Sequence, residues 1–125
     1  MYIRFVVGTV QEKLNRLHGP ITELRLLRDE GSLYDYEETQ ANSIFEWFNS
    51  KLPCPPFDES NWPITAISWF KVNAEAQVFI QKMYEIQVIL NEHEIQTRTI
   101  KTDDPGKKLY EDQYQVIATS PRGKY

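Results

Sequence analysis

Several protein classes are excluded by what this chain of 125 residues contains too little of. Its single cysteine, Cys54, can form no disulfide within the chain and no zinc site built on cysteines. Its two histidines, His18 and His93, are isolated, so we expect no metal ligands. No segment approaches the roughly 18 consecutive apolar residues of a transmembrane helix, and the first ten residues lack the basic start of a signal peptide. We therefore expect a cytoplasmic protein with no membrane partner.

Positive charge is also scarce. Fourteen Lys and Arg residues stand against eighteen Asp and Glu residues, which gives a net charge of -4. Binding to a phosphate backbone needs clustered basic side chains. The chain offers only Lys107 with Lys108 in a turn, and Arg122 with Lys124 near its end. We expect no nucleic-acid partner.

The compact patterns that carry nucleotide binding or hydrolysis are absent: there is no Gly-x-Gly-x-x-Gly, Gly-x-Ser-x-Gly or His-Glu-x-x-His. Acidic residues do gather near the last turn, and paired carboxylates can perform acid–base chemistry or hold a cation. Exposed acidic turns are common, however, and this spacing matches no calcium loop. No catalytic residue and no cofactor can be named, which favours a protein that is not an enzyme. The acidic residues concerned are Asp103, Asp104, Glu111 and Asp112.

The first half of the chain predicts one strand and two helices. Aromatic and β-branched residues predict a strand over residues 2–7. Pro20 opens a helix that ends at Gly31, because proline suits the first helical position and glycine suits the left-handed cap. Ser32 is the expected N-cap of a second helix, which Pro53 stops.

The second half predicts a strand, a helix and a hairpin. Residues 64–71 are apolar on both faces, which indicates a strand in the middle of a sheet. Asn73 caps a long helix that extends to about residue 91. Residues 95–102 alternate as a third strand, and after a Pro-Gly turn the chain returns as a fourth strand over 114–119.

We expect a single domain over residues 1–125, with a proline-rich loop at 53–63 and a flexible tail at 120–125. The element order is β-α-α-β-α-β-β. A strand–helix–strand step is normally a right-handed crossover to a parallel neighbour, whereas a hairpin is antiparallel. The order therefore predicts an α+β fold with a four-stranded mixed sheet packed against helices. Helices on one face would make a two-layer sandwich; the alternative is a three-layer α/β arrangement.

Parts of the sequence resemble a group of small bacterial proteins of unassigned function. The similar segments are an N-terminal YIRF strand, a Trp-Phe pair in the second helix, an ISWFK strand and a PG…YED…QV hairpin. They extend from Tyr2 to about Ala118. The chain departs from the group's pattern after His93, where Glu94 stands in place of an expected glycine. The resemblance implies a bacterial protein of one domain, and it implies no activity or ligand.

Four residues could form an anion site at the carboxyl ends of the first two strands. In open α/β sheets, ligands bind beyond the carboxyl ends of parallel strands. Lys71 would lie beside the free N–H groups that open the long helix, and such a positive end suits a carboxylate or a phosphate. The alternative is that Lys71 is simply the first solvated residue after a buried strand. The four candidates for ligand binding are Arg4, Trp69, Lys71 and Asn73.

Aromatic residues make up 13% of the chain. Trp69 and Phe70 point to opposite faces of their strand. A sheet covered on one face only would therefore leave an aromatic patch for a partner or a second subunit, although core packing is the alternative for each single ring. The candidates for partner binding are Phe57, Trp62 and Trp69.

The favoured hypothesis is a non-enzymatic cytoplasmic module that forms a homo-oligomer, such as a homodimer, or binds a protein partner through these aromatic residues. The alternative is a domain that binds a small anionic molecule, or a small enzyme, with its site at the carboxyl ends of the first two strands. The sequence names neither the ligand nor the partner.

Overall fold

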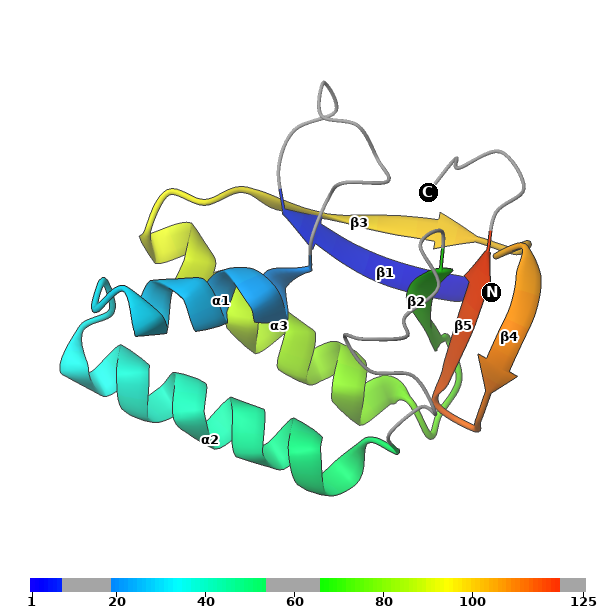
Figure 1. Cartoon of the computed structure of the whole chain (residues 1–125), viewed down its shortest axis with the longest axis horizontal. Helices are drawn as coiled ribbons and strands as arrows, with labels where there is room; N and C mark the ends of the chain where they lie inside the picture. The colour runs from blue at the N-terminus through cyan, green and yellow to red at the C-terminus, as the bar shows by residue number, and fades with distance from the viewer. Residues whose placement is uncertain (8–18, 54–65, 120–125) are drawn as a thin grey trace.

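The computed structural model describes residues 1–7, 19–53 and 66–119, which form an α+β fold (Figure 1). Five of its elements are strands of one sheet and three are helices. In chain order they are β1 (Tyr2–Val7), α1 (Pro20–Asp29), α2 (Asp35–Lys51), β2 (Ala66–Lys71), α3 (Gln77–Glu92), β3 (Thr97–Thr102), β4 (Lys107–Glu111) and β5 (Gln115–Thr119).

The sheet has the strand order β3-β1-β2-β5-β4, and every neighbouring pair is antiparallel. The predicted four-stranded mixed sheet is therefore wrong both in its number of strands and in its parallel pairs. The additional strand is β4, which begins with Lys107 and Lys108 and is mostly exposed. An exposed edge strand needs no alternating apolar residues, which are the signal by which a strand is predicted. The sequence alone therefore predicts this polar segment as part of a turn. The prediction that β2 lies centrally is confirmed.

The crossover rule predicted that strands joined by a helix run parallel, and one such pair does so although its two strands are not neighbours in the sheet. β2 and β3, which α3 connects, are both antiparallel to β1 and hence parallel to each other. β1 lies between them. Between β1 and β2 the chain passes through two helices that run in opposite directions (Figure 1), so the rule for a crossover through one helix does not describe this step.

The three helices lie on one face of the sheet (Figure 1). Ile3 and Phe5 of β1 point toward them and belong to a buried cluster that includes Leu24, Ile44 and Ile86 from the three helices. For the described residues this is the predicted two-layer arrangement, with the main core between the layers.

The opposite face of the sheet is buried as well, although none of the three helices lies on it. Val6, Trp69, Val116 and Ala118 are at most 1% exposed. We call this surface, on which Arg4 also lies, the helix-free face. Its burial explains why β1, β2 and β5 lack the alternation of a strand with one solvated side.

The first helix begins and ends as predicted. Pro20 is its first residue, and Gly31 follows its end with a φ of 73° in the left-handed region. The N–H of Ser32 bonds to the carbonyl oxygen of Leu27 at 2.9 Å, which completes a Schellman motif. Ser32 therefore closes α1, and the prediction that it caps α2 is wrong.

The N-cap of α2 is Tyr34, whose backbone N–H donates to Oε1 of Glu37 at 3.0 Å. The same oxygen lies 2.8 Å from Nε2 of His93, at the end of α3. Glu37 is only 2% exposed. One buried carboxylate thus caps one helix and ties it to the end of another.

Asn73 lies four residues before α3 and caps the turn that leads into it: its Oδ1 accepts the N–H of Ala76 at 2.7 Å. At the other end, the N–H of Ile95 bonds to the carbonyl oxygen of Leu90 at 3.0 Å in a second Schellman motif. The residue in the left-handed conformation is Glu94, with a φ of 61°. A glycine would suit this position better.

Candidate functional site

Three of the four predicted ligand-binding residues share the helix-free face. Tyr2 pairs with Lys71 and Ile3 with Phe70, so the same register places Arg4 beside Trp69. The guanidinium carbon of Arg4 lies 5.8 Å from the centroid of the Trp69 ring, within the range of a cation–π contact. The prediction that the carboxyl ends of the first two strands lie together is wrong, however. β1 and β2 are antiparallel, so their carboxyl ends lie at opposite ends of the sheet.

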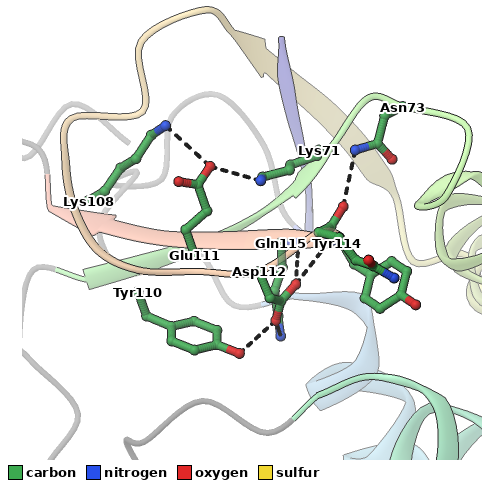
Figure 2. A network of polar contacts seen from close by, with 9 residues as sticks. Lys71, Asn73, Lys108, Tyr110, Glu111, Asp112, Tyr114 and Gln115 are labelled. Atoms are coloured by element: carbon green, nitrogen blue, oxygen red, sulfur yellow. Dashed lines mark hydrogen bonds and ion pairs between the residues drawn. The ribbon is translucent and has the colours of Figure 1, made fainter.

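Lys71 is held by a carboxylate of the hairpin. Its Nζ lies 2.8 Å from Oε2 of Glu111, which is also 3.3 Å from Nζ of Lys108 (Figure 2). The hydrogen bond from Lys71 lowers the pKa of Glu111, with Lys108 contributing, against the opposing effect of burial. A hollow of about 230 Å³ adjoins this network, lined by Met1, Tyr2, Lys71, Val72, Asn73 and Glu111.

Asn73 uses both ends of its side-chain amide to hold the chain. While Oδ1 caps the turn before α3, Nδ2 donates to the carbonyl oxygen of Gln113 at 3.1 Å (Figure 2). The amide therefore fixes the start of the helix to the hairpin between β4 and β5, and this role alone accounts for its position.

The acidic residues of the hairpin serve its geometry. Asp112 accepts hydrogen bonds from the hydroxyl of Tyr110, from the N–H groups of Tyr114 and Gln115, and from the side chain of Gln115 (Figure 2). Burial raises its pKa, but these hydrogen bonds outweigh burial and the pKa is lowered. Asp104 accepts the N–H of Gly106 at 3.1 Å. Among the described residues no group of His, Cys, Asp or Glu could hold a metal ion.

Of the three predicted partner-binding residues, only Trp69 lies within the described residues. Phe57 and Trp62 lie outside the described residues. Trp69 is 1% exposed, so it could contact a partner only if the atoms that cover its ring moved. Partner binding through these three residues remains a prediction.

Arg98 of β3 is a residue of this face that the sequence reasoning missed. Arg98 lies opposite Val6, and Arg4 lies opposite Ile100, so the two arginines are diagonal neighbours on the helix-free face. Burial, together with the positive charge of Arg98, lowers the pKa of Arg4 to about 10. The alternation of residues 95–102 places Arg98 and Ile100 on one side of their strand, but no sequence signal shows that β1 is the neighbour.

β3 is one edge of the described sheet. All six of its residues pair with β1 without a break in register, and no other described strand pairs with it. A groove of about 430 Å³ lies beside its start, and we call it the α3 groove. Two of its side chains are well exposed: Tyr84 at 45% and Val88 at 64%. The groove is lined by Tyr84, Gln87, Val88, Asn91, Gln96 and Thr97.

The other edge, β4, differs in ways that oppose pairing with a further strand. It has a break in register between Lys108 and Tyr110, and it begins with two exposed lysines. Bulges and edge lysines are devices that prevent pairing with other chains. β3 has no such break, although it carries Arg98 and Lys101.

No family model matches the chain, and no curated protein or solved structure matches it either. None of the described helices is long and apolar enough to cross a membrane. The resemblance to small bacterial proteins therefore remains a prediction.

Proposed function

We propose that this protein is a non-enzymatic binding module that takes up an extended segment of a partner protein along β3. The observation that carries the proposal is the regular six-residue ladder between β1 and β3, whose outer side pairs with no described strand. An edge strand presents a row of backbone N–H and C=O groups that another extended chain can pair with.

The α3 groove supplies the contacts for side chains. Thr97 pairs with Val7 and Thr99 with Phe5, so these threonines lie on the side of the helices. An added strand would point every second side chain toward the groove, where Tyr84 and Val88 offer apolar surface. Backbone pairing would then give affinity, and the groove would select apolar residues at alternate positions.

The charge of β3 favours an acidic segment over a second copy of this chain. The strand carries Arg98 and Lys101 and no carboxylate, although the chain as a whole has a net charge of -4. Two copies paired through β3 would bring four positive charges together, whereas acidic residues would be complementary to them. Arg98 lies on the helix-free side of β3 and Lys101 on the side of the helices. The preferred segment is therefore extended, with apolar residues toward the α3 groove alternating with Asp or Glu on the side of Arg98.

The test uses ten-residue peptides in which apolar residues alternate with Asp or Glu, and matched peptides with Lys in place of the acids. We expect saturable binding of the acidic set by fluorescence anisotropy and at least tenfold weaker binding of the basic set. Val88→Lys should weaken binding at least tenfold, because Val88 lines the groove.

Val78→Lys is the matched control. Val78 is also an exposed valine of α3, at 49%, but it does not line the groove. Equal losses in the two variants would contradict the proposed position. A different result would change the proposed partner. If no peptide binds, and sedimentation shows a dimer that Val88→Lys disrupts, the partner is a second copy of this chain and not an acidic segment.

A further inference from the structure

Arg98 carries two buried donors for which the described part of the chain supplies no acceptor: Nε and Nη2 make no hydrogen bond. In a guanidinium the N–H bonds of these two nitrogens point in the same direction. They form the fork that binds two oxygens of one carboxylate or phosphate. Buried donors of a charged group are rarely left without a partner, because the loss of hydration is then uncompensated.

Arg4 adds a second positive charge at the same place. The cross-strand register puts Arg4 and Arg98 diagonally across β1 and β3 on the helix-free face, where such neighbours lie roughly 7–8 Å apart. Arg4 is 8% exposed. Two like charges on one buried surface repel each other, and an anion bound between them would relieve the repulsion.

Apolar side chains surround the two arginines among the described residues. Trp69 lies against Arg4, and the side chains of Val6 and Val116 on the same face are fully buried. Two described carboxylates are engaged elsewhere, since the exposed Glu111 binds Lys71 and the buried Glu37 binds His93. Charge interactions are stronger in such a setting than in water.

We propose that Arg98 and Arg4 hold an oxyanion, the carboxylate or phosphate group of a small molecule, on the helix-free face of the sheet. The fork of Arg98 takes two oxygens of the anion, and Arg4 supplies the second charge. The site lies on the face opposite the α3 groove, although Arg98 also contributes to the positive charge of β3 that the proposed partner binding uses. Because the fork is buried, the anion enters only when the atoms that cover it move.

The test is a calorimetric and thermal-shift titration of the full chain with inorganic phosphate, sulfate, acetate and glutarate, against sodium chloride at equal ionic strength. Binding of phosphate or sulfate would indicate a phosphate ligand, whereas binding of acetate or glutarate would indicate a carboxylate ligand. We expect saturable binding of at least one anion and a rise in melting temperature that chloride does not produce. Binding of none of the four, or effects equal to those of chloride, would overturn the proposal.

Variants then locate the site. Arg98→Met should weaken anion binding at least tenfold and raise the melting temperature of the anion-free protein, because it removes an unsatisfied buried fork. Lys101→Met, on the same strand but on its other side and exposed, should leave binding unchanged. Equal affinity in Arg98→Met, or a lower melting temperature without anion, would show that the fork has another role.

A measurement on the unmodified protein covers the case in which Arg98→Met does not fold. The Nε–H resonance of Arg98 should shift with the same saturation curve as the calorimetric signal. A resonance that stays in place while an anion binds would place the anion elsewhere and overturn the assignment.

Discussion

The carboxylate of Glu37, in the first turn of α2, lies 2.8 Å from Nε2 of His93 at the end of α3. The same oxygen accepts the N–H of Tyr34, and the side chain is almost completely buried. Burial alone would raise the pKa of Glu37, but the hydrogen bonds from Tyr34 and His93 outweigh burial and lower it. The contact therefore stabilises the fold only while Glu37 is ionised.

The lowered pKa predicts how stability depends on pH. The ordinary pKa of this carboxyl is 4.5, so the stabilisation is fully present above about this pH. It is lost as the pH falls through the lower pKa of the folded state, because the folded protein binds the proton less readily than the unfolded chain does. Urea unfolding between pH 3 and pH 6 should show this decline.

Glu37→Gln is the corresponding variant. It should lower the free energy of unfolding at pH 7 by about 1–3 kcal/mol, since a charged acceptor of two hydrogen bonds is lost, and it should flatten the pH dependence below pH 5. Glu38→Gln, at an exposed neighbouring position, is the control. An unchanged pH profile in Glu37→Gln would contradict the proposed role of the buried carboxylate.

Glu94→Gly should stabilise the protein. The φ of 61° at Glu94 is disfavoured for a residue with a Cβ atom and costs glycine nothing. We expect the free energy of unfolding to rise by about 0.5–1 kcal/mol, in chemical denaturation at pH 7. Glu92→Gly, within the last turn of α3, should have the opposite effect. A loss of stability in Glu94→Gly would mean that the carboxylate of Glu94 matters more than its backbone conformation.

Asp112→Ala should destabilise the hairpin, because the donors of Tyr114 and Gln115 would lose their common acceptor. The expected loss is about 2–3 kcal/mol in the free energy of unfolding, from buried donors left without partners. Asp103→Ala is the control, since the side chain of Asp103 is 83% exposed and should matter little. Equal losses in the two variants would show that the hydrogen bonds of Asp112 do not organise the turn.

Lys71→Met should cost less than about 1 kcal/mol, because its ion pair with Glu111 is partly solvated and Lys108 remains near the same oxygen. The pKa of Glu111 should rise toward its ordinary value, as measured by carboxyl NMR titration. A much larger loss of stability, or an unchanged pKa, would contradict the network in Figure 2.

Local sequence signals predicted the elements whose cause is local. β1 over residues 2–7 has the predicted bounds, and Pro20 and Gly31 mark the ends of α1 as their backbone chemistry requires. The prediction that Asn73 is the N-cap of α3 is wrong: the N-cap is Ala76, and Asn73 caps the preceding turn. The predicted central position of β2 is also correct, because a strand that is apolar on both faces must be covered on both.

Features that depend on pairing could not be predicted. Nothing in a single sequence shows that β1 separates β2 from β3, or that Arg98 lies beside Arg4. The polar strand β4 was missed for a related reason, since an exposed edge needs no apolar pattern. Three of the four predicted ligand-binding residues lie on the helix-free face. Arg98, which belongs to the proposed oxyanion site, could be found only from the register of β1 with β3.

Hydrogen exchange at the β3 amides, with and without an acidic peptide of alternating pattern, tests the central claim most directly. In the free protein alternate amides of Thr97–Thr102 point away from β1 and should exchange quickly. The account predicts that a bound peptide slows these amides by at least tenfold and leaves those of β4 unchanged. Peptide binding that protects β4, or that leaves every β3 amide unchanged, would contradict it.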